Sequence, residues 1–183
     1  MTNKHCISTW LRVIGVALAL SVSEGPSFAQ EHLSLTSAAF ASGEKIPAAY
    51  TCSGENKSPA LKWSGAPSST QGYAMIVSDP DAPMGTFVHW VIYDIPASLS
   101  GLGEGIAKSE LVPGVGTQGL NSAGQIGYKG PCPPPGKPHH YHFRLYALNF
   151  VMGSKPGLSA SELERLIQGH EVASTELVGI FER

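Results

Sequence analysis

Two apolar runs joined by a long loop constrain the fold of this chain more than any other feature. The runs are Tyr73–Ser78, YAMIVS, and Phe87–Ile95, FVHWVIYDI. Both are rich in β-branched and aromatic residues, which favour strands. Residues 79–86 between them hold two aspartates and two prolines and exceed the roughly two to five residues of an ordinary hairpin loop. We therefore expect an antiparallel strand pair whose loop presents side chains to a ligand.

The composition favours the same fold class. Glycine (21) and proline (14) are abundant among the 183 residues, and only 14% of residues are charged. This balance favours short strands joined by turns, and the length suits one domain with a sizeable core. A helix is expected at residues 159–168, where Ser159 and Glu162 form a capping-box pattern. The sequence thus predicts an all-β single domain with one or two short helices.

Alternation along the two strands predicts which side chains meet. One face of the first strand carries Tyr73, Met75, Val77 and Asp79. One face of the second is expected to carry Phe87, His89, Val91 and Tyr93. In an antiparallel pair, Asp79 and His89 can then meet at one rim of the sheet.

A further strand is expected at His139–Leu148, HHYHFRLYAL. Its odd-numbered residues become increasingly apolar, which places His139 and Tyr141 on the inward face and His140 and His142 on the opposite face. The three histidines of this run are therefore not expected to share one metal ion. The chain also lacks an H-E-x-x-H motif and any Cys/His ligand spacing, so we expect no metal and no cofactor.

The segment between these strands, Pro96–Pro138, contains ten glycines and seven prolines and almost no apolar periodicity. A connection this long in a compact domain is usually functional or disordered. Because its ends adjoin both histidine-bearing stretches, we favour a functional loop.

The N-terminus has the pattern of an export signal. Lys4 and Arg12 precede the apolar run Val13–Leu20, and Ser27 and Ala29 are small residues at the positions that a signal peptidase requires. The run is shorter than the roughly 20 residues that a membrane-spanning helix needs. We expect a signal peptide at 1–29 and a domain at 30–183 that is exported, periplasmic or secreted, with no membrane span after cleavage.

Charge and cysteine content limit the partners and the compartment. Removing residues 1–29 leaves 10 basic and 13 acidic residues, a net charge of −3, which gives no reason to expect nucleic acid as a partner. The same cut leaves only Cys52 and Cys132. In an oxidising compartment this pair is a candidate disulfide, although spacing alone leaves the bond open.

The candidate chemistry rests on Asp79, Asp81, His89, His139 and Tyr141. Imidazole and phenol groups, backbone N–H groups of a glycine-rich loop, and a carboxylate that selects a histidine tautomer are the parts of a small-anion pocket. We therefore favour an exported protein that binds phosphate or a phosphorylated head group, and we assign no catalytic residue.

Two other functions stay open at this point. A hydrolase of phosphorylated or ester substrates could use His89 or His139 as a general base, although the chain has no G-x-S-x-G nucleophile motif. An inhibitor could instead contact a protein partner through the loop surface. The sequence also leaves a homodimer open.

Two separated motifs carry a family resemblance. DPDAP followed by HW, and GYKGPCPPPG followed by HHYHF, together with YTCSGENKSPALKWSG, resemble the phosphatidylethanolamine-binding protein family and its bacterial Raf-kinase-inhibitor-like branch. The resemblance covers most of residues 30–183. It implies a β-rich domain of Greek-key character with antiparallel sheets and a small ligand cavity at one end. The pocket residues that it implies are Asp79, Pro83, His89, Gly130, His139 and Tyr141.

Overall fold

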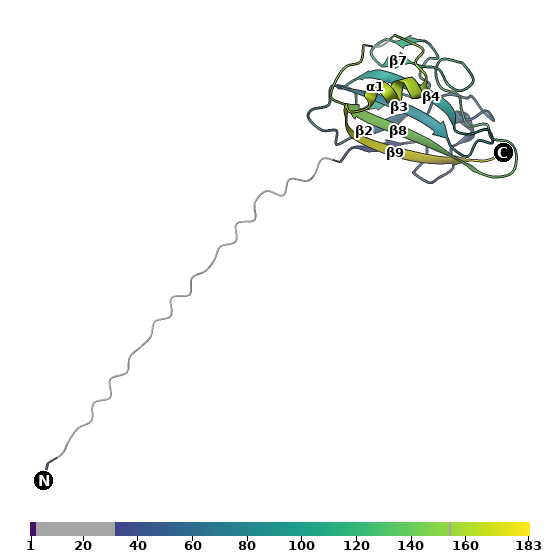
Figure 1. Ribbon diagram of the computed structural model, residues 1–183. Coiled ribbons are helices and arrows are strands. Elements are labelled where there is room, and N and C mark those ends of the chain that lie inside the picture. The colour runs from purple at the N-terminus through teal and green to yellow at the C-terminus, as the bar shows by residue number, and fades with distance from the viewer. Residues whose placement is uncertain (3–31, 154) are drawn as a thin grey trace. The chain divides into compact units, whose positions relative to one another are not determined.

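The computed structural model describes residues 1–2, 32–153 and 155–183 (Figure 1). The predicted signal peptide therefore lies, apart from its first two residues, outside the described residues. The described residues from 32 to the C-terminus form one compact unit. Its elements are β1 (Ser34–Ser37), a 3-10 turn (Ala48–Tyr50), β2 (Leu61–Ser64), β3 (Gly72–Asp79), β4 (Phe87–Pro96), β5 (Gly101–Leu102), β6 (Leu111–Val112), β7 (Gly116–Gln118), β8 (His139–Leu148), α1 (Ala160–Ile167) and β9 (Glu171–Phe181).

The strands form two antiparallel sheets. The smaller sheet has the order β1-β2-β5 and the larger has the order β6-β7-β4-β3-β8-β9. Strands β3, β4 and β7 follow one another in space, and β8 then returns to lie beside β3, which is the Greek-key arrangement. The predicted all-β fold with antiparallel Greek-key sheets is confirmed.

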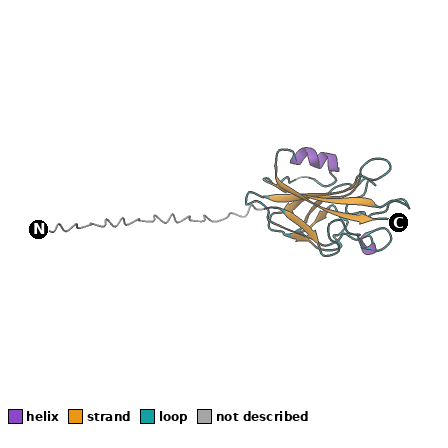
Figure 2. Cartoon of the chain, turned by 90° about the horizontal axis from the view of Figure 1, so that it is seen from below, coloured by secondary structure: helices purple, strands orange, loops and turns teal. Residues whose placement is uncertain are grey.

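Two apolar clusters lie on opposite faces of the larger sheet. One fills the space between the sheets and includes Leu61 and Trp63 of the smaller sheet with Met75 and Trp90 of the larger. The other lies on the outer face, where α1 covers residues such as Tyr93. Figure 2 shows α1 on one side of the larger sheet and the smaller sheet on the other.

Helix α1 begins as the sequence predicts. The Ser159 side chain accepts a hydrogen bond from the Glu162 N–H, and the Glu162 carboxylate accepts one from the Ser159 N–H. Leu163 and Ile167 are buried against the outer face of the larger sheet. Among the described residues, no helix has the length and apolar character needed to cross a membrane.

The face assignment of β4 is only half correct. Val77 pairs with Trp90 and Ser78 pairs with Val88, so His89 is an extra residue without a partner in β3. Such a bulge reverses the alternation of the residues that follow it. Phe87 and His89 therefore share the inner face with Asp79, whereas Val91 and Tyr93 belong to the outer cluster. The prediction that all four side chains of β4 share one face is wrong for Val91 and Tyr93.

The predicted cysteine pair is bonded. Cys52 and Cys132 form a disulfide across a sequence separation of 80 residues. The Cys52 N–H also donates a hydrogen bond to the Pro131 carbonyl, at 3.0 Å. The bond thus joins the loop after the 3-10 turn to the glycine/proline-rich connection.

We expect the Cys52→Ala/Cys132→Ala double variant to lose about 2–4 kcal/mol of unfolding free energy, because the bond restricts the unfolded chain. Urea denaturation under non-reducing conditions measures this loss. Adding a reductant should lower the unfolding free energy of the wild type to that of the double variant, and it should leave the double variant unchanged. Equal stability of the two proteins without reductant would contradict the prediction.

Candidate ligand pocket

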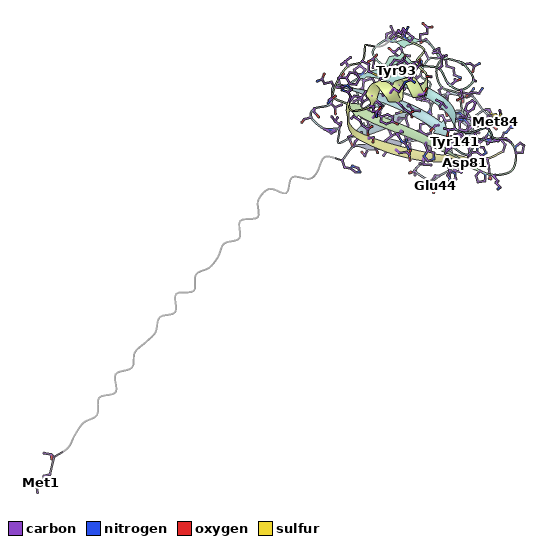
Figure 3. All side chains as sticks on the ribbon, in the orientation of Figure 1. Met1, Glu44, Asp81, Met84, Tyr93 and Tyr141 are labelled. Carbon is purple, nitrogen blue, oxygen red and sulfur yellow. A yellow bond between two sulfur atoms is a disulfide. The ribbon has the colours of Figure 1, made fainter. Side chains whose placement is uncertain are left out.

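A small cavity opens at one end of the larger sheet, beside the β3–β4 loop. Its volume is about 190 Å³. Asp81 and Met84 of the β3–β4 loop and Tyr141 of β8 mark this end of the sheet in Figure 3. The lining residues are Asp79, Ala82, Pro83, Phe87, His89, Lys129, Gly130, Cys132, Pro133, Pro134 and His139. Five of the six predicted pocket residues therefore line one cavity, and the sixth, Tyr141, contacts His89 from the core side.

The Asp79 carboxylate anchors one side of the cavity. It is 3% exposed, and both of its oxygens accept hydrogen bonds. Oδ1 accepts the Asp81 N–H at 2.9 Å, and Oδ2 lies 2.7 Å from Nδ1 of His139. Because a carboxylate only accepts, Nδ1 of His139 carries the proton. Asp79 therefore orients its own loop and His139, and both carboxylate oxygens already have partners.

His89 is held in a comparable way by the opposite wall. Its Nδ1 lies 2.6 Å from the Lys129 carbonyl oxygen, so this nitrogen also carries the proton. Its ring meets the Tyr141 ring edge-on, with 5.1 Å between centroids. Burial lowers the pKa of His89 below its ordinary value, although the bond to Lys129 and the charge of Asp79 act in the opposite direction.

The two histidines therefore bond the protein through the same ring nitrogen. Each donates its Nδ1–H to a protein oxygen, and no Nε2 partner is found among the described residues. A neutral imidazole accepts a hydrogen bond through Nε2, and an imidazolium donates one. The pair can thus receive a donor group when neutral and an anion when protonated.

Tyr141 supports the pocket from within the core. Its side chain is fully buried, and its hydroxyl has no hydrogen-bond partner among the described residues. Burial raises the pKa of this hydroxyl far above its ordinary value, and the charge of Asp79 raises it further. The phenol therefore stays neutral and keeps an O–H donor next to His89 and Asp79.

Gly130 shapes the wall through its lack of a side chain. Its N–H donates to Oδ1 of Asn56 at 2.7 Å, so this donor is not available to a ligand. A Cβ at this position would lie 2.5 Å from the Tyr50 carbonyl oxygen and 2.9 Å from Cα of Thr51. Glycine is needed here because the segment after Lys129 packs directly on the backbone of the disulfide loop.

The predicted separation of the histidines on β8 is confirmed. His139 and Tyr141 are buried on the inner face, whereas His140 and His142 lie on the outer face, where their rings meet Asp81 and Glu176. His140 and His142 therefore take no part in the cavity.

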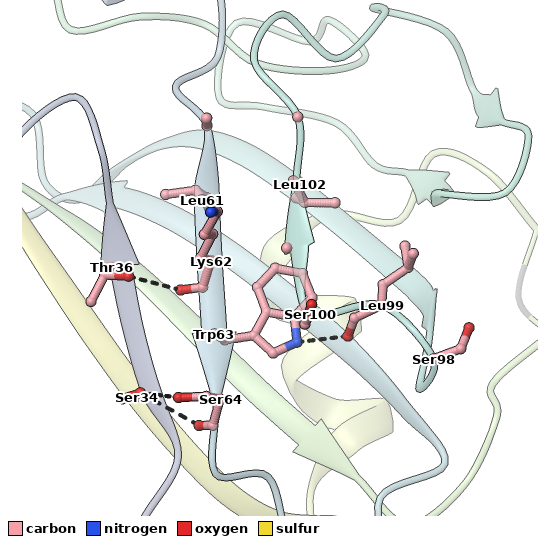
Figure 4. Close-up of a pocket in the computed structure, with 13 residues that line it drawn as sticks. Ser34, Thr36, Leu61, Lys62, Trp63, Ser64, Ser98, Leu99, Ser100 and Leu102 are labelled. Carbon is pink, nitrogen blue, oxygen red and sulfur yellow. Dashed lines mark hydrogen bonds between the residues drawn. The ribbon is translucent and has the colours of Figure 1, made fainter.

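A larger hollow of about 730 Å³ lies over the smaller sheet and the segment that precedes β5 (Figure 4). Its polar side chains mostly bond to protein groups already: Ser34 pairs with Ser64 at 3.0 Å, and Thr36 donates to the Lys62 carbonyl. Trp63 is buried beneath it and donates to the Leu99 carbonyl. This hollow is broad and lacks the convergent titratable groups of the smaller cavity.

Comparison with known proteins agrees with this fold. The sequence matches the phosphatidylethanolamine-binding protein family over residues 36–182. The chain belongs to this family. The matched residues include every predicted pocket residue and both bonded cysteines.

Relatives of the family extend across bacteria and archaea. A UPF0098 protein of Methanothermobacter thermautotrophicus is 42% identical over 151 residues, 82% of this chain and 99% of the relative. A UPF0098 protein of Pyrococcus horikoshii is 47% identical over 158 residues, 84% of this chain and 79% of the relative.

Two solved structures of the family share the fold. The phosphatidylethanolamine-binding protein homologue of Chlamydia trachomatis has a TM-score of 0.76 and 37% identity, covering 84% of this chain and 99% of its own. YbcL of E. coli, described as a member of the mammalian family, also has a TM-score of 0.76, with 32% identity over 83% of this chain and 99% of its own.

Sequence reasoning missed three parts of the site. The Lys129 carbonyl orients His89, and the Asn56 side chain fixes Gly130, but neither contact has a signature in the sequence. Phe87 packs against the His89 ring, with 4.8 Å between centroids. Its position on the His89 face was predicted, although its place in the cavity wall was not.

We expect Gly130→Ala to lower the unfolding free energy by about 1–3 kcal/mol, because the added methyl group meets backbone atoms that cannot yield easily. Gly103→Ala is the matched control, since a Cβ there has no atom within 4 Å, and it should change stability by less than about 0.5 kcal/mol. Chemical denaturation of both variants checks the difference. Similar changes in unfolding free energy for the two variants would contradict the prediction, because they would show that the cavity wall accommodates the added methyl group.

Proposed function

We propose that residues 30–183 form an exported binding protein whose cavity takes a small anionic group, such as phosphate or a phosphorylated head group. The family and its fold support small-ligand binding. The observation that supports an anion in particular is the pair His89 and His139, which line one cavity with Nδ1 of both rings already bonded. On protonation, both rings gain an N–H donor at Nε2.

Proton uptake accompanies anion binding in this proposal. Nε2 of a neutral histidine carries a lone pair and repels an oxygen without a proton, so an anion such as sulfate requires at least one protonated ring in the complex. Burial favours the neutral form of His89. A bound anion offsets that effect by supplying the opposite charge. The ligand and the proton therefore bind His89 together.

The rest of the cavity suits a ligand with a short apolar part. The wall beside the histidines is formed by Ala82, Pro83, Phe87, Pro133 and Pro134. A volume of about 190 Å³ is close to that of six water molecules and smaller than the pockets that enclose drug-sized ligands. A phosphorylated head group fits this combination, and the family's name refers to a phospholipid of that chemistry.

Export rests on two features of the chain. The sequence of residues 1–29 has the charged, apolar and small-residue regions of a signal peptide. The Cys52–Cys132 bond is typical of proteins in oxidising compartments.

A hydrolase is the second candidate, because Asp79 and His139 form a carboxylate–histidine pair that could activate a water molecule. The lining residues include no serine, threonine or free thiol as a nucleophile. Under the binding proposal, nitrophenyl phosphate, diester and carboxylate ester substrates should turn over no faster with wild type than with His139→Gln. Turnover that this variant abolishes would favour the enzyme.

We expect the affinity for sulfate to rise as the pH falls through 6.5, by up to about ten-fold per pH unit for one coupled proton. Sulfate keeps its charge over this range, so the change reports on the protein. The rise should continue below pH 6.5, because the pKa of free His89 lies below its ordinary value. Calorimetry at a series of pH values measures it.

His89→Gln should weaken sulfate binding and flatten its pH dependence. The matched control is His170→Gln, which changes an exposed histidine outside the cavity and should leave both unchanged. A pH-independent affinity in the wild type, or full affinity in His89→Gln, would exclude the anion proposal.

A further inference from the structure

The outer face of β8 carries a second pair of histidines. His140 and His142 alternate with the buried His139 and Tyr141, and their side chains are 49% and 27% exposed. Two residues apart on one strand, their backbone positions are about 6.6 Å from each other. Their side chains project from the same face of the sheet.

Each of these rings is held by a carboxylate. Nδ1 of His140 lies 2.7 Å from Oδ2 of Asp81, and the same oxygen accepts the backbone N–H of His140 at 2.8 Å. Nδ1 of His142 lies 3.1 Å from Oε2 of Glu176, whose other oxygen accepts from Arg144. Both Nδ1 atoms therefore carry protons, and neither Nε2 atom has a hydrogen-bond partner in the described part of the chain.

The two carboxylates lie on opposite flanks of the strand. Asp81 belongs to the β3–β4 loop, Glu176 belongs to β9, and β8 runs between β3 and β9. Along β8 they also lie at opposite ends of the pair, since Glu176 is opposite Arg144 and Asp81 bonds the backbone of His140. Nε2 lies on the far side of each ring from Nδ1, so each Nε2 is turned away from the carboxylate that holds its ring.

This arrangement is the one that metal-binding histidines adopt. A ligating imidazole usually donates its second N–H to a carboxylate or carbonyl, which selects the tautomer and makes the free nitrogen a better ligand. Imidazole nitrogen suits Zn²⁺ and Cu²⁺ in particular. Two isolated surface ion pairs, by contrast, would stabilise the protein by less than about 1 kcal/mol and give no reason for paired free nitrogens.

We propose that His140 and His142 bind one Zn²⁺ or Cu²⁺ ion through Nε2, with Asp81 and Glu176 as positioning residues. Among the described residues, no group of three or more His, Cys, Asp or Glu side chains is arranged to hold a metal. The site therefore has two protein ligands, and water completes the coordination. It is separate from the anion cavity, because His139 faces the other side of the sheet.

The hydrogen bonds around Asp81 make this a fixed site rather than two mobile side chains. The Asp81 N–H donates to Asp79, and the Asp81 carboxylate binds His140 through both its ring and its backbone. Because a carboxylate only accepts hydrogen bonds, Nδ1 of His140 carries the proton of this bond.

The experiment is a Cu²⁺ titration of the untagged full-length chain, followed by calorimetry and by electron paramagnetic resonance. The spectrum should show two imidazole nitrogens on the ion. His140→Gln and His142→Gln should each reduce the affinity by about ten-fold or more, and Asp81→Asn by about 10–100-fold. All variants keep the N-terminal residues, so the differences report on β8.

One control completes the design. His170→Gln removes an exposed histidine whose Nδ1 meets an amide instead of a carboxylate, and it should retain the affinity within about two-fold. Unchanged binding in His140→Gln and His142→Gln, or an equal loss in His170→Gln, would overturn the proposal.

Discussion

The structure of the candidate site depends on one buried carboxylate. Placing Asp79 inside the protein costs several kcal/mol unless its oxygens are bonded, and both are: one to the backbone of Asp81 and one to the ring of His139. These two bonds close the β3–β4 loop on itself and join it to β8. The position of His139, the course of the loop and the floor of the cavity therefore share a single anchor.

The alternation of side chains along β8 separates its polar residues onto the two faces of the sheet. His139 and Tyr141 belong to the interior, and His140 and His142 belong to the outer face. The same division occurs in the loop, where Asp79 serves the inner face and Asp81 the outer one. One short acidic loop thus orients histidines on both sides of a sheet.

Much of this arrangement could be predicted from the sequence because it follows local periodicity. The alternation of β8 and the capping box of α1 depend on neighbouring residues and were predicted correctly. Asp79, His89 and His139 were candidates from their residue types and strand positions. The family resemblance added Pro83 and Gly130 and assigned all five to one pocket, because spacing alone does not predict the path of a connection of more than forty residues. The contacts of Lys129 and Asn56 could not be predicted, because a carbonyl oxygen is present at every residue and an amide has many uses.

The error on β4 has a different origin. The bulge at His89 depends on which residues of β3 lie opposite, and the pattern of one strand does not contain that information.

The bulge also couples the position of His89 to the packing of β4. Upstream of it, Phe87 and His89 face the cavity, and downstream of it Trp90 and Val91 enter two separate apolar clusters. A β4 paired one residue out of step would exchange the clusters that Trp90 and Val91 enter, and the resulting misfit of core side chains costs about 1–3 kcal/mol. Packing of the two clusters therefore favours the native register of β4. In that register His89 already lies at the cavity.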